Sequence, residues 1–478
     1  MKDFLKIMIA SAIGFIIAQI LLSLIAMLIF FGAAGSFLGS MSSEKFTLQD
    51  NSVLHLKLEG TIVERTAEPD AFTSFISSEY QTTTGLNDIV SAIRKSKNDD
   101  KIKGIYIDSR MLSASMATLA EIRGELDSFK ESGKFIVAYS DTYTQGGYYL
   151  ASVADKIAIN PHGMLDIHGL SSTPIFFKDA LDKLGIDMQI FKVGTYKSAV
   201  EPFTQNEMSD ANREQISSYL ADAWSFLRSD FAESRSLTID DVDSIADSLP
   251  LMQSTDYLQS VNLVDTVLYE TEMKDYLRTL LDLDEDKKIP AATVANMKSV
   301  KTKTVQKTNN TIGILYASGN IASGTGSSDI QDKYLVGEIE KLRKDDDIKA
   351  VVFRINSGGG SAYASEQIWK AITDLKEEKP VVVSMGDMAA SGGYYIACNA
   401  DKIVAQPTTI TGSIGIFGIL PNLEGTTEKI GIHTESVKTN EYSDFGNITR
   451  PLSAGEQQLM QTYVEKGYDL FLTRCAEG

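Results

Sequence analysis

The sequence predicts an α/β protein with two similar domains in tandem, preceded by a transmembrane helix. Three observations support this prediction. A gapless internal repeat relates the two halves of the chain, each repeat alternates strand-like apolar runs with helical ones, and a long uncharged segment lies near the N-terminus. Alternation of strands and helices along a chain is typical of a parallel sheet covered by helices.

Charge and composition limit the classes of function. The 45 basic and 64 acidic residues give a net charge of −19, which opposes binding to nucleic-acid phosphates. The two cysteines, Cys398 and Cys475, have no metal-binding spacing and are too few for a disulfide framework. We interpret Cys398, which lies in an apolar run, as a packing residue and not as a reactive thiol. The four histidines also lack metal-binding spacing, so we expect no metal and no cofactor.

Residues 1–38 are predicted to form a short cytoplasmic tip and a transmembrane helix. The segment from Ile7 to Gly35 is almost purely apolar and contains no charged residue. About 20 residues suffice for a helix to cross the bilayer, whereas the apolar core of a cleaved signal peptide has only ~7–15. We therefore expect a retained anchor, with cleavage near the small residues 33–36 as the alternative. Lysines before the span predict a cytoplasmic N-terminus and an external remainder.

An internal repeat organises the rest of the chain. Residues 141–157 align without gaps with residues 387–403, and both segments contain Gly-Gly-Tyr-Tyr followed by Ala-Asp-Lys-Ile. A short apolar run precedes each segment, at 135–138 and 381–384. We expect a strand, then a loop and a short helix, in both repeats.

The repeat also predicts the domain boundaries. We expect an N-terminal domain at 52–281 and a C-terminal domain at 311–478. The polar segment 282–310 between them has no apolar periodicity and is predicted to be a mobile connection or a strap. The first repeat continues for about 50 residues past the point that matches residue 478, so we expect the second domain to be incomplete and not shorter by design.

Positions at which the repeats differ indicate a single candidate site. Ser391 follows a predicted strand and precedes a predicted helix, where the first repeat has Gln145. A helix N-terminus favours a developing anion, and the glycines that follow Ser391 allow a substrate to approach closely. The alternative is that Ser391 is a plain helix N-cap. The glycine-rich segment Ser357–Gly360 offers backbone N–H groups to a carbonyl oxygen, with a flexible turn as its alternative.

The first repeat contributes a lysine where the second has none. Lys197 follows an apolar run, and its counterpart is Glu441, so each half supplies one member of a Ser/Lys pair. An ordinary solvated lysine is the alternative. To accept a hydroxyl proton the amine must be neutral, which requires burial to lower its pKa from ~10.4 by about 3 units. We expect its apolar neighbours to bury it: Tyr196, Ala199, Val200 and Phe203.

Four motifs resemble those of signal peptide peptidase A in its long, double-domain form. They occur at Gly194–Phe203, Arg354–Ser361, Met385–Tyr395 and Thr411–Gly418. The resemblance implies two ClpP/crotonase-like domains of βα spiral turns, assembled as a homotetramer on the outer face of the cytoplasmic membrane. It further implies cleavage of remnant signal peptides and other apolar peptides.

The same resemblance implies roles for individual residues. Ser391 is expected to be the nucleophile and Lys197 the general base. The N–H groups of Gly360 and Gly392 are expected to form the oxyanion hole, and Ser413 to orient the lysine amine. One departure is Gly358, where the family usually has a proline that would fix the loop backbone.

Two other classes of function fit the sequence less well. A non-proteolytic membrane scaffold would leave the serine and the lysine as capping and surface residues. An acyl-CoA enzyme on a crotonase-like sheet is disfavoured, because catalytic glutamates cannot be identified in the expected loops and the domains are predicted to lie outside the cytoplasm.

Overall fold

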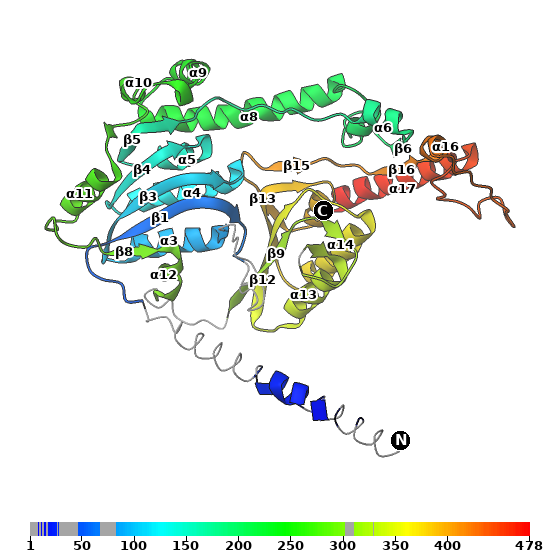
Figure 1. Ribbon diagram of the computed structural model, residues 1–478, viewed down its shortest axis with the longest axis horizontal. Coiled ribbons are helices and arrows are strands. Elements are labelled where there is room, and N and C mark those ends of the chain that lie inside the picture. The colour runs from blue at the N-terminus through cyan, green and yellow to red at the C-terminus, as the bar shows by residue number, and fades with distance from the viewer. Residues whose placement is uncertain are drawn as a thin grey trace. The chain divides into compact units, whose positions relative to one another are not determined.

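The computed structural model describes residues 46–66, 83–301, 310–327 and 329–478, together with scattered residues between 8 and 27. Residues 49–478 form one compact unit, and residues 1–48 form another that is described by itself. Within residues 49–478 each repeat folds as a parallel sheet with helices packed against it (Figure 1). The predicted α/β class is confirmed. Below, the first half means residues 49–301 and the second half residues 310–478.

The predicted membrane span lies mostly outside the described residues. Residues 18–25, which belong to it, are helical. In the part of the chain that the structure describes, no helix is both long and apolar enough to cross a membrane.

The first half contains a seven-stranded sheet whose strands are all parallel. Its order is β2-β1-β3-β4-β5-β7, and β8 lies beside β1. Strands such as β3 are rich in apolar residues because helices cover both faces of a parallel sheet, and Ile105 and Ile107 are fully buried. The strands are β1 (Ser52–Val63), β2 (Thr83–Gly85), β3 (Ile102–Ser113), β4 (Phe135–Tyr143), β5 (Lys156–Leu165), β7 (Thr266–Val267) and β8 (Ala291–Thr293).

Helices of the first half turn one apolar stripe toward the sheet. In α3, for example, Ile89 and Ile93 lie one turn apart and are both buried. The helices are α3 (Leu86–Asn98), α4 (Met116–Lys130), α5 (Gln145–Ala151), α6 (Lys178–Leu184), α7 (Glu201–Thr204), α8 (Asp210–Arg235), α9 (Ile239–Asp247), α10 (Thr255–Ser260), α11 (Glu270–Leu280) and α12 (Val294–Ser299), with a 3₁₀ turn at Pro250–Met252.

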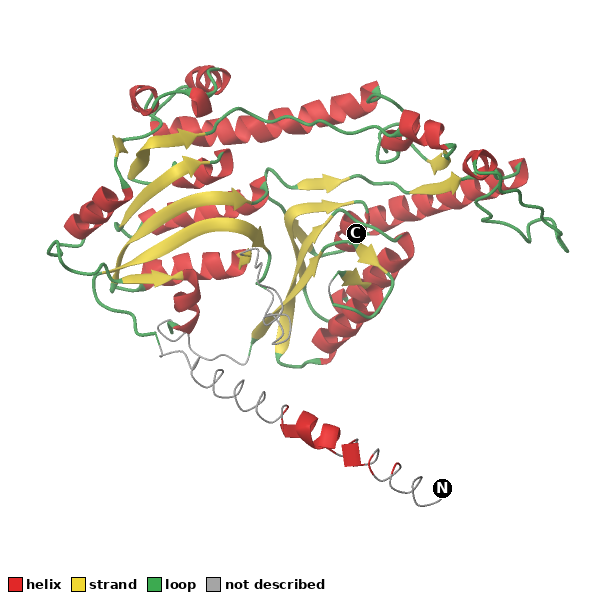
Figure 2. Cartoon of the chain, in the orientation of Figure 1, coloured by secondary structure: helices red, strands yellow, loops and turns green. Residues whose placement is uncertain are grey.

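The second half has a parallel five-stranded sheet of order β14-β13-β12-β9, with β15 beside β13 (Figure 2). Phe353 and Val383 on this sheet pack in one core cluster with Ile368 and Ile372 of α14, all fully buried. The strands are β9 (Thr311–Ser318), β10 (Ile321–Ala322), β11 (Ile330–Gln331), β12 (Ile348–Ser357), β13 (Val381–Ala390), β14 (Lys402–Val404) and β15 (Ile410–Gly412). The helices are α13 (Asp332–Lys344), α14 (Ala362–Lys376), α15 (Gly392–Ala397), α16 (Glu424–Lys429) and α17 (Ala454–Glu477).

The repeated Ala-Asp-Lys-Ile sequence has the same structural task in both halves. Asp155 accepts a hydrogen bond from the backbone N–H of Ile136 at 2.8 Å, and Asp401 accepts one from Val381 at 2.7 Å. Each aspartate therefore fixes the start of the strand that leads to the Gly-Gly-Tyr-Tyr helix. The predicted repeat of strand, loop and short helix is present as β4 with α5 and as β13 with α15.

The segment between the halves is ordered over part of its length. Within 282–310, β8 pairs with β1, and Lys95 of α3 donates a hydrogen bond to the carbonyl oxygen of Met297 in α12 at 2.8 Å. These contacts favour the strap over the mobile connection. Its strand and helix are too short to produce an apolar period in the sequence. Residues 302–309 of this segment lie outside the described residues.

An antiparallel ribbon joins the two halves. Strand β6 (Asp187–Lys192) of the first half pairs with β16 (Phe417–Asn422) of the second (Figure 1). Next to the ribbon the backbones of Gly185 and Gly425 approach so closely that a Cβ atom on Gly185 would lie 2.4 Å from the Gly425 carbonyl carbon. The ribbon therefore holds the loop after β6 against the second half.

Candidate active site

Ser391 lies at the turn between β13 and α15, as predicted. Its φ of 53° is in a region that disfavours side chains, and such strain persists only where the surroundings enforce it. The Ser391 N–H donates to the carbonyl oxygen of Gly412 at 2.8 Å, and its own carbonyl accepts from Tyr395 at 2.9 Å. The Ser391 side chain makes no capping hydrogen bond. The plain N-cap interpretation is therefore not supported, and the hydroxyl group is available to another partner.

That partner is Lys197, in the loop that follows β6. Lys197 Nζ lies 3.2 Å from Ser391 Oγ, 2.9 Å from the carbonyl oxygen of Ser413 and 3.2 Å from Ser413 Oγ. The fold thus brings together three residues that the sequence analysis had singled out, from positions 194 residues apart in the case of the lysine and Ser391. Glu441, the predicted counterpart of Lys197, lies in an exposed turn.

Burial determines the protonation of the Lys197 amine. The residue is 7% exposed, and this desolvation lowers the pKa of its amine. No acidic group among the described residues contributes to that pKa. A buried amine without a counter-charge favours its neutral form, which has two N–H donors and one lone pair. Both donors can be used by the oxygens of Ser413, and the lone pair then faces the Ser391 hydroxyl.

The groups that bury Lys197 differ in part from those expected. Tyr196 is 54% exposed and donates its hydroxyl to Glu214 at 3.1 Å, and Ala199 is also exposed, so the prediction for these two was wrong. Val200 is fully buried and Phe203 half-buried. Gly415 of the second half packs on the lysine stem, where a Cβ atom would lie 3.4 Å from Lys197 Cδ. Part of the burial therefore comes from residues more than 200 positions away.

Two backbone N–H groups lie beside Ser391. The backbone of Ile321 hydrogen-bonds to the residues on either side of Gly360, at 3.0 and 2.8 Å. Because N–H directions alternate along a strand, the N–H of Gly360 points away from Ile321. On that other side lies Gly392, where a Cβ atom would be 3.2 Å from the nitrogen of Gly360. Gly392 is the first residue of α15, so its N–H has no acceptor within the helix.

The glycine-rich segment is a fixed structure and not a flexible turn. Gly359 and Gly360 adopt φ values of 97° and 154°, which side chains rarely tolerate. A Cβ atom on Gly359 would lie 2.5 Å from the nitrogen of Gly392. Gly358 does not have a positive φ, so it is the one glycine of the three whose backbone does not require glycine.

Gln145 closes the equivalent position in the first half. Its side-chain oxygen accepts hydrogen bonds from the backbone N–H groups of His168 and Gly169, at 3.0 and 3.1 Å, and its amide donates to the carbonyl oxygen of Gly169 at 3.1 Å. In the gapless alignment Gly169 corresponds to Gly415, which packs on Lys197. In the first half, Gln145 therefore bridges directly to the loop at Gly169. In the second half, Lys197 of the other half lies between Ser391 and the matching loop at Gly415.

Polar contacts between the halves were not identified from the sequence. Arg354 on β12 forms ion pairs with Glu64 and Glu121 of the first half, both at 3.0 Å. Burial raises the pKa of the Glu64 carboxyl group, and the neighbouring Arg354 opposes this shift. Arg354 belonged to a recognised motif, but no pattern along the chain indicates its two acidic partners.

Comparison with known proteins identifies the class to which this fold and site belong. The family model described as "Peptidase family S49" matches residues 128–284 and 373–478. "Protease 4" of Haemophilus influenzae is 36% identical over 90% of this chain and 72% of its own length. "Protease 4" of Salmonella typhi is 36% identical over 84% of the chain and 66% of its own length, and "Serine protease SPPA, chloroplastic" of Arabidopsis thaliana is 30% identical over 90% and 63%.

These matches define a serine protease, and the predicted family resemblance is confirmed. The chain belongs to peptidase family S49. The two matched segments fall in the first and the second half, in agreement with a duplicated domain. The chain spans between 63% and 72% of the length of these relatives.

Replacing Lys197 by methionine should stabilise the fold at neutral pH. Because the native pKa is lowered, the unfolded chain binds more protons than the native one between that pKa and ~10.4, and native stability rises with pH across this window. Methionine lacks this penalty, so the gain of Lys197→Met over the unchanged protein should shrink as the pH approaches ~10.4. Urea unfolding at several pH values measures this difference in the free energy of unfolding. An equal gain for Lys370→Met, an exposed site on α14, would contradict the explanation.

Proposed function

We propose that this serine protease cleaves peptide bonds with a Ser391/Lys197 dyad. The observation that carries the proposal is the 3.2 Å separation of Lys197 Nζ and Ser391 Oγ in a buried setting. A serine hydroxyl is a weak nucleophile until a neighbouring base accepts its proton, and a lysine can be that base only when it is neutral. Burial without a counter-charge favours the neutral amine.

The proposed reaction is acyl transfer in two steps. Lys197 takes the proton of Ser391 Oγ as this oxygen attacks the scissile carbonyl carbon, and the resulting ammonium group then gives the proton to the leaving amine. The acyl-enzyme is hydrolysed when Lys197 accepts a proton from water and the hydroxide attacks the ester carbonyl, after which the proton returns to Ser391. The two oxygens of Ser413, at 2.9 and 3.2 Å, hold the amine in place during both steps.

The N–H groups of Gly360 and Gly392 form the oxyanion hole in this proposal. The negative charge that develops on the carbonyl oxygen needs donors already in position, and backbone N–H groups held by a fixed loop meet that need. The geometry of Gly359 and Gly360 supports the assignment, because a Cβ atom on Gly359 would collide with the nitrogen of Gly392 and one on Gly360 with the backbone of Ile321.

The proposed substrates are remnant signal peptides and other apolar peptides, and the proposed location is the cytoplasmic membrane. Support comes from the four motifs shared with signal peptide peptidase A and from the uncharged segment between Ile7 and Gly35. A bilayer anchor would keep the protease close to peptides that remain in the membrane after their release. In this proposal the N-terminus is cytoplasmic and both halves lie on the outer side.

We further propose that the chain assembles as a homotetramer through two segments that lie outside its strands. Continued with the same spacing, the alignment matches β6 with His433–Lys438 and β16 with residues 171–176. The pairing of Lys197 with Glu441 lies beyond β6 and is shifted from this spacing by two residues. In the described part of the chain neither of these segments pairs with a strand, although β6 and β16 pair with each other. Segment His433–Lys438 of one copy can therefore pair with residues 171–176 of the next. Such head-to-tail contacts form a ring when the rotation from one copy to the next closes, and the proposed ring has four copies.

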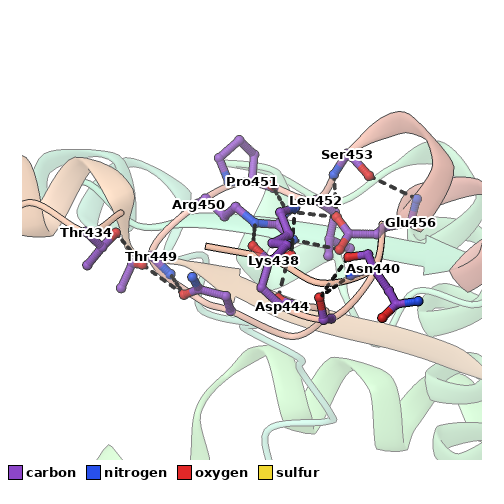
Figure 3. Close-up of polar contacts among 12 residues, drawn as sticks. Thr434, Lys438, Asn440, Asp444, Thr449, Arg450, Pro451, Leu452, Ser453 and Glu456 are labelled. Carbon is purple, nitrogen blue, oxygen red and sulfur yellow. Dashed lines mark hydrogen bonds and ion pairs between the residues drawn. The ribbon is translucent and has the colours of Figure 1, made fainter. Parts of the chain in front are cut away.

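The unpaired segment is held by a polar network (Figure 3). Lys438 and Arg450 both form ion pairs with Asp444, at 2.8 and 2.9 Å, and Arg450 also pairs with Glu456 at the start of α17, at 2.7 Å. Thr434 lies 2.8 Å from Thr449 across the loop. These contacts tie Thr434 and Lys438 to the rest of the loop, while Val437 between them is 98% exposed, which supports a role in association.

Loss of either dyad member should abolish cleavage of an apolar peptide. Ser391→Ala and Lys197→Arg are each expected to lower kcat/KM by at least about a thousandfold, since arginine keeps its charge at every pH used. The unchanged protein should gain activity with rising pH as the Lys197 amine loses its proton. Steady-state cleavage across pH 5–10 measures both effects. Lys341→Arg, at an exposed position on α13, serves as the control. Cleavage by both dyad variants at the control rate would refute the mechanism.

The anchor can be tested in bacterial cells. The full chain is expected in the membrane pellet after alkaline carbonate extraction, and protease added to spheroplasts should digest both halves. Leu22→Arg should release part of the protein, because arginine at the centre of a span costs roughly 2.5–3.5 kcal/mol on insertion scales. Leu22→Ala should remain in the pellet. A chain that stays soluble without any substitution would rule out the anchor.

The assembly can be tested with one substitution in the unpaired segment. Val437→Pro removes a backbone N–H and should convert the tetramer to smaller species, because proline is not tolerated in a paired strand interior. Val437→Thr keeps the N–H and the branched side chain and should assemble normally. Sedimentation velocity of the detergent-solubilised chain distinguishes them. Equal sedimentation of the two variants as tetramers would exclude this interface.

A further inference from the structure

Helix α4 of the first half is capped by a residue of the second half. Its own N-cap residue, Ser115, makes no side-chain capping bond, and its first turn has no acidic residue. Instead, Asp387 accepts hydrogen bonds from the Thr118 N–H and from the Thr118 hydroxyl, both at 2.8 Å, through different carboxylate oxygens. A carboxylate in this place satisfies an unpaired N–H group and opposes the positive end of the helix dipole.

The matching helix in the second half caps itself. In the gapless alignment Ser115 corresponds to Ser361 and Thr118 to Ala364. Ser361 Oγ accepts a hydrogen bond from the Ala364 N–H at 3.3 Å in the ordinary way. Both repeats therefore have the serine at the N-cap position. In the second half the serine caps its own helix, whereas in the first half the Asp387 carboxylate accepts the hydrogen bond instead.

The matching aspartate in the first half stays within its own half. Asp141 corresponds to Asp387, and it accepts hydrogen bonds from the Tyr139 hydroxyl at 2.9 Å and from the Asn160 amide at 3.0 Å. The aspartate is common to both repeats, so its presence alone does not account for the contact with α4. The contact between the halves is specific to the repeat that carries Ser391.

Asp387 is itself fixed on the strand that leads to Ser391. Asn356 of β12 donates to Asp387 at 3.3 Å and to Glu64 at 3.2 Å, and its amide oxygen accepts from the N–H of Met388 at 3.1 Å. The carboxylate therefore links α4 to β13 only four residues before Ser391. Arg354 adds to this contact between the halves through its ion pairs with Glu64 and Glu121.

We propose that Asp387 is a positioning residue for the dyad, which sets the separation of Ser391 and Lys197 by capping α4 of the other half. The inference rests on the proposed function and adds a residue to it. Asp387 does not touch the amine or the hydroxyl, and it acts through the placement of β13. Misplacement of a reacting group by about 1 Å can cost on the order of a hundredfold in rate.

The test compares Asp387→Asn with Asp141→Asn in the full chain. Asparagine retains one acceptor but loses the charge and the second carboxylate oxygen. We expect kcat to fall about tenfold or more with little change in KM, since the loss lies in the alignment of reacting groups. We also expect the acid limb of the pH profile to move to higher pH, because a looser contact hydrates the Lys197 amine. Asp141→Asn should change neither quantity, and Thr118→Val, which keeps the N–H, should have an intermediate effect.

A second measurement does not depend on turnover. Competitive labelling of Lys197 with acetic anhydride across pH, measured by mass spectrometry, gives the titration midpoint of its amine. Lys192, which donates to the Lys197 carbonyl oxygen at 3.4 Å, lies in the same half as Lys197, and the substitution does not remove it. A midpoint that rises in Asp387→Asn and not in Asp141→Asn supports the inference, even if the unchanged protein cleaves no peptide and the proposed function fails. Equal midpoints in all three proteins overturn it, whatever the cleavage rates.

Discussion

The amine of Lys197 is buried, and no described residue places an opposite charge beside it; the rest of the site depends on this constraint. A charged amine is poorly tolerated where water is excluded, so the pocket favours the neutral form. Ser413 and Gly415 of the second half lie against this amine and its stem, although Lys197 itself belongs to the first half. The protonation state of the Lys197 amine therefore depends on the packing of the second half against the first.

The two repeats contribute different parts of the candidate site. The second half alone contains the strained turn at Ser391, the glycine loop beside it and the Ser413 oxygens, whereas the first half adds the lysine and the surface on which these parts are aligned. In the first half, Gln145 stands at the position that Ser391 has in the second. Its amide bonds to the facing loop at Gly169, and these hydrogen bonds close the position in the first half that Ser391 occupies in the second.

The sequence predicted those features that lie close together along the chain or recur in it. The repeat, the turn at Ser391 and the pairing of Ser391 with Lys197 followed from comparing two similar segments. The cap of α4 did not, because Asp387 and Thr118 are 269 residues apart and each fits an ordinary local role. The burial of Lys197 was expected from neighbours along the chain such as Tyr196 and Ala199, but these two residues are exposed. Gly415 packs on the lysine instead, and its distance along the chain hid this contact from the sequence. Short elements such as β8 gave no periodic signal.

The ribbon of β6 and β16 has a consequence for the time at which the protein becomes active during its synthesis. Strand β6 leaves the ribosome more than 200 residues before its partner, and the loop that carries Lys197 has no wall to pack against until β16 has been made. On the proposed mechanism a chain that has not yet reached β16 cannot bury its lysine, so the amine stays solvated and is no base for Ser391. On that mechanism the growing chain is therefore inactive until translation has passed both strands of the ribbon.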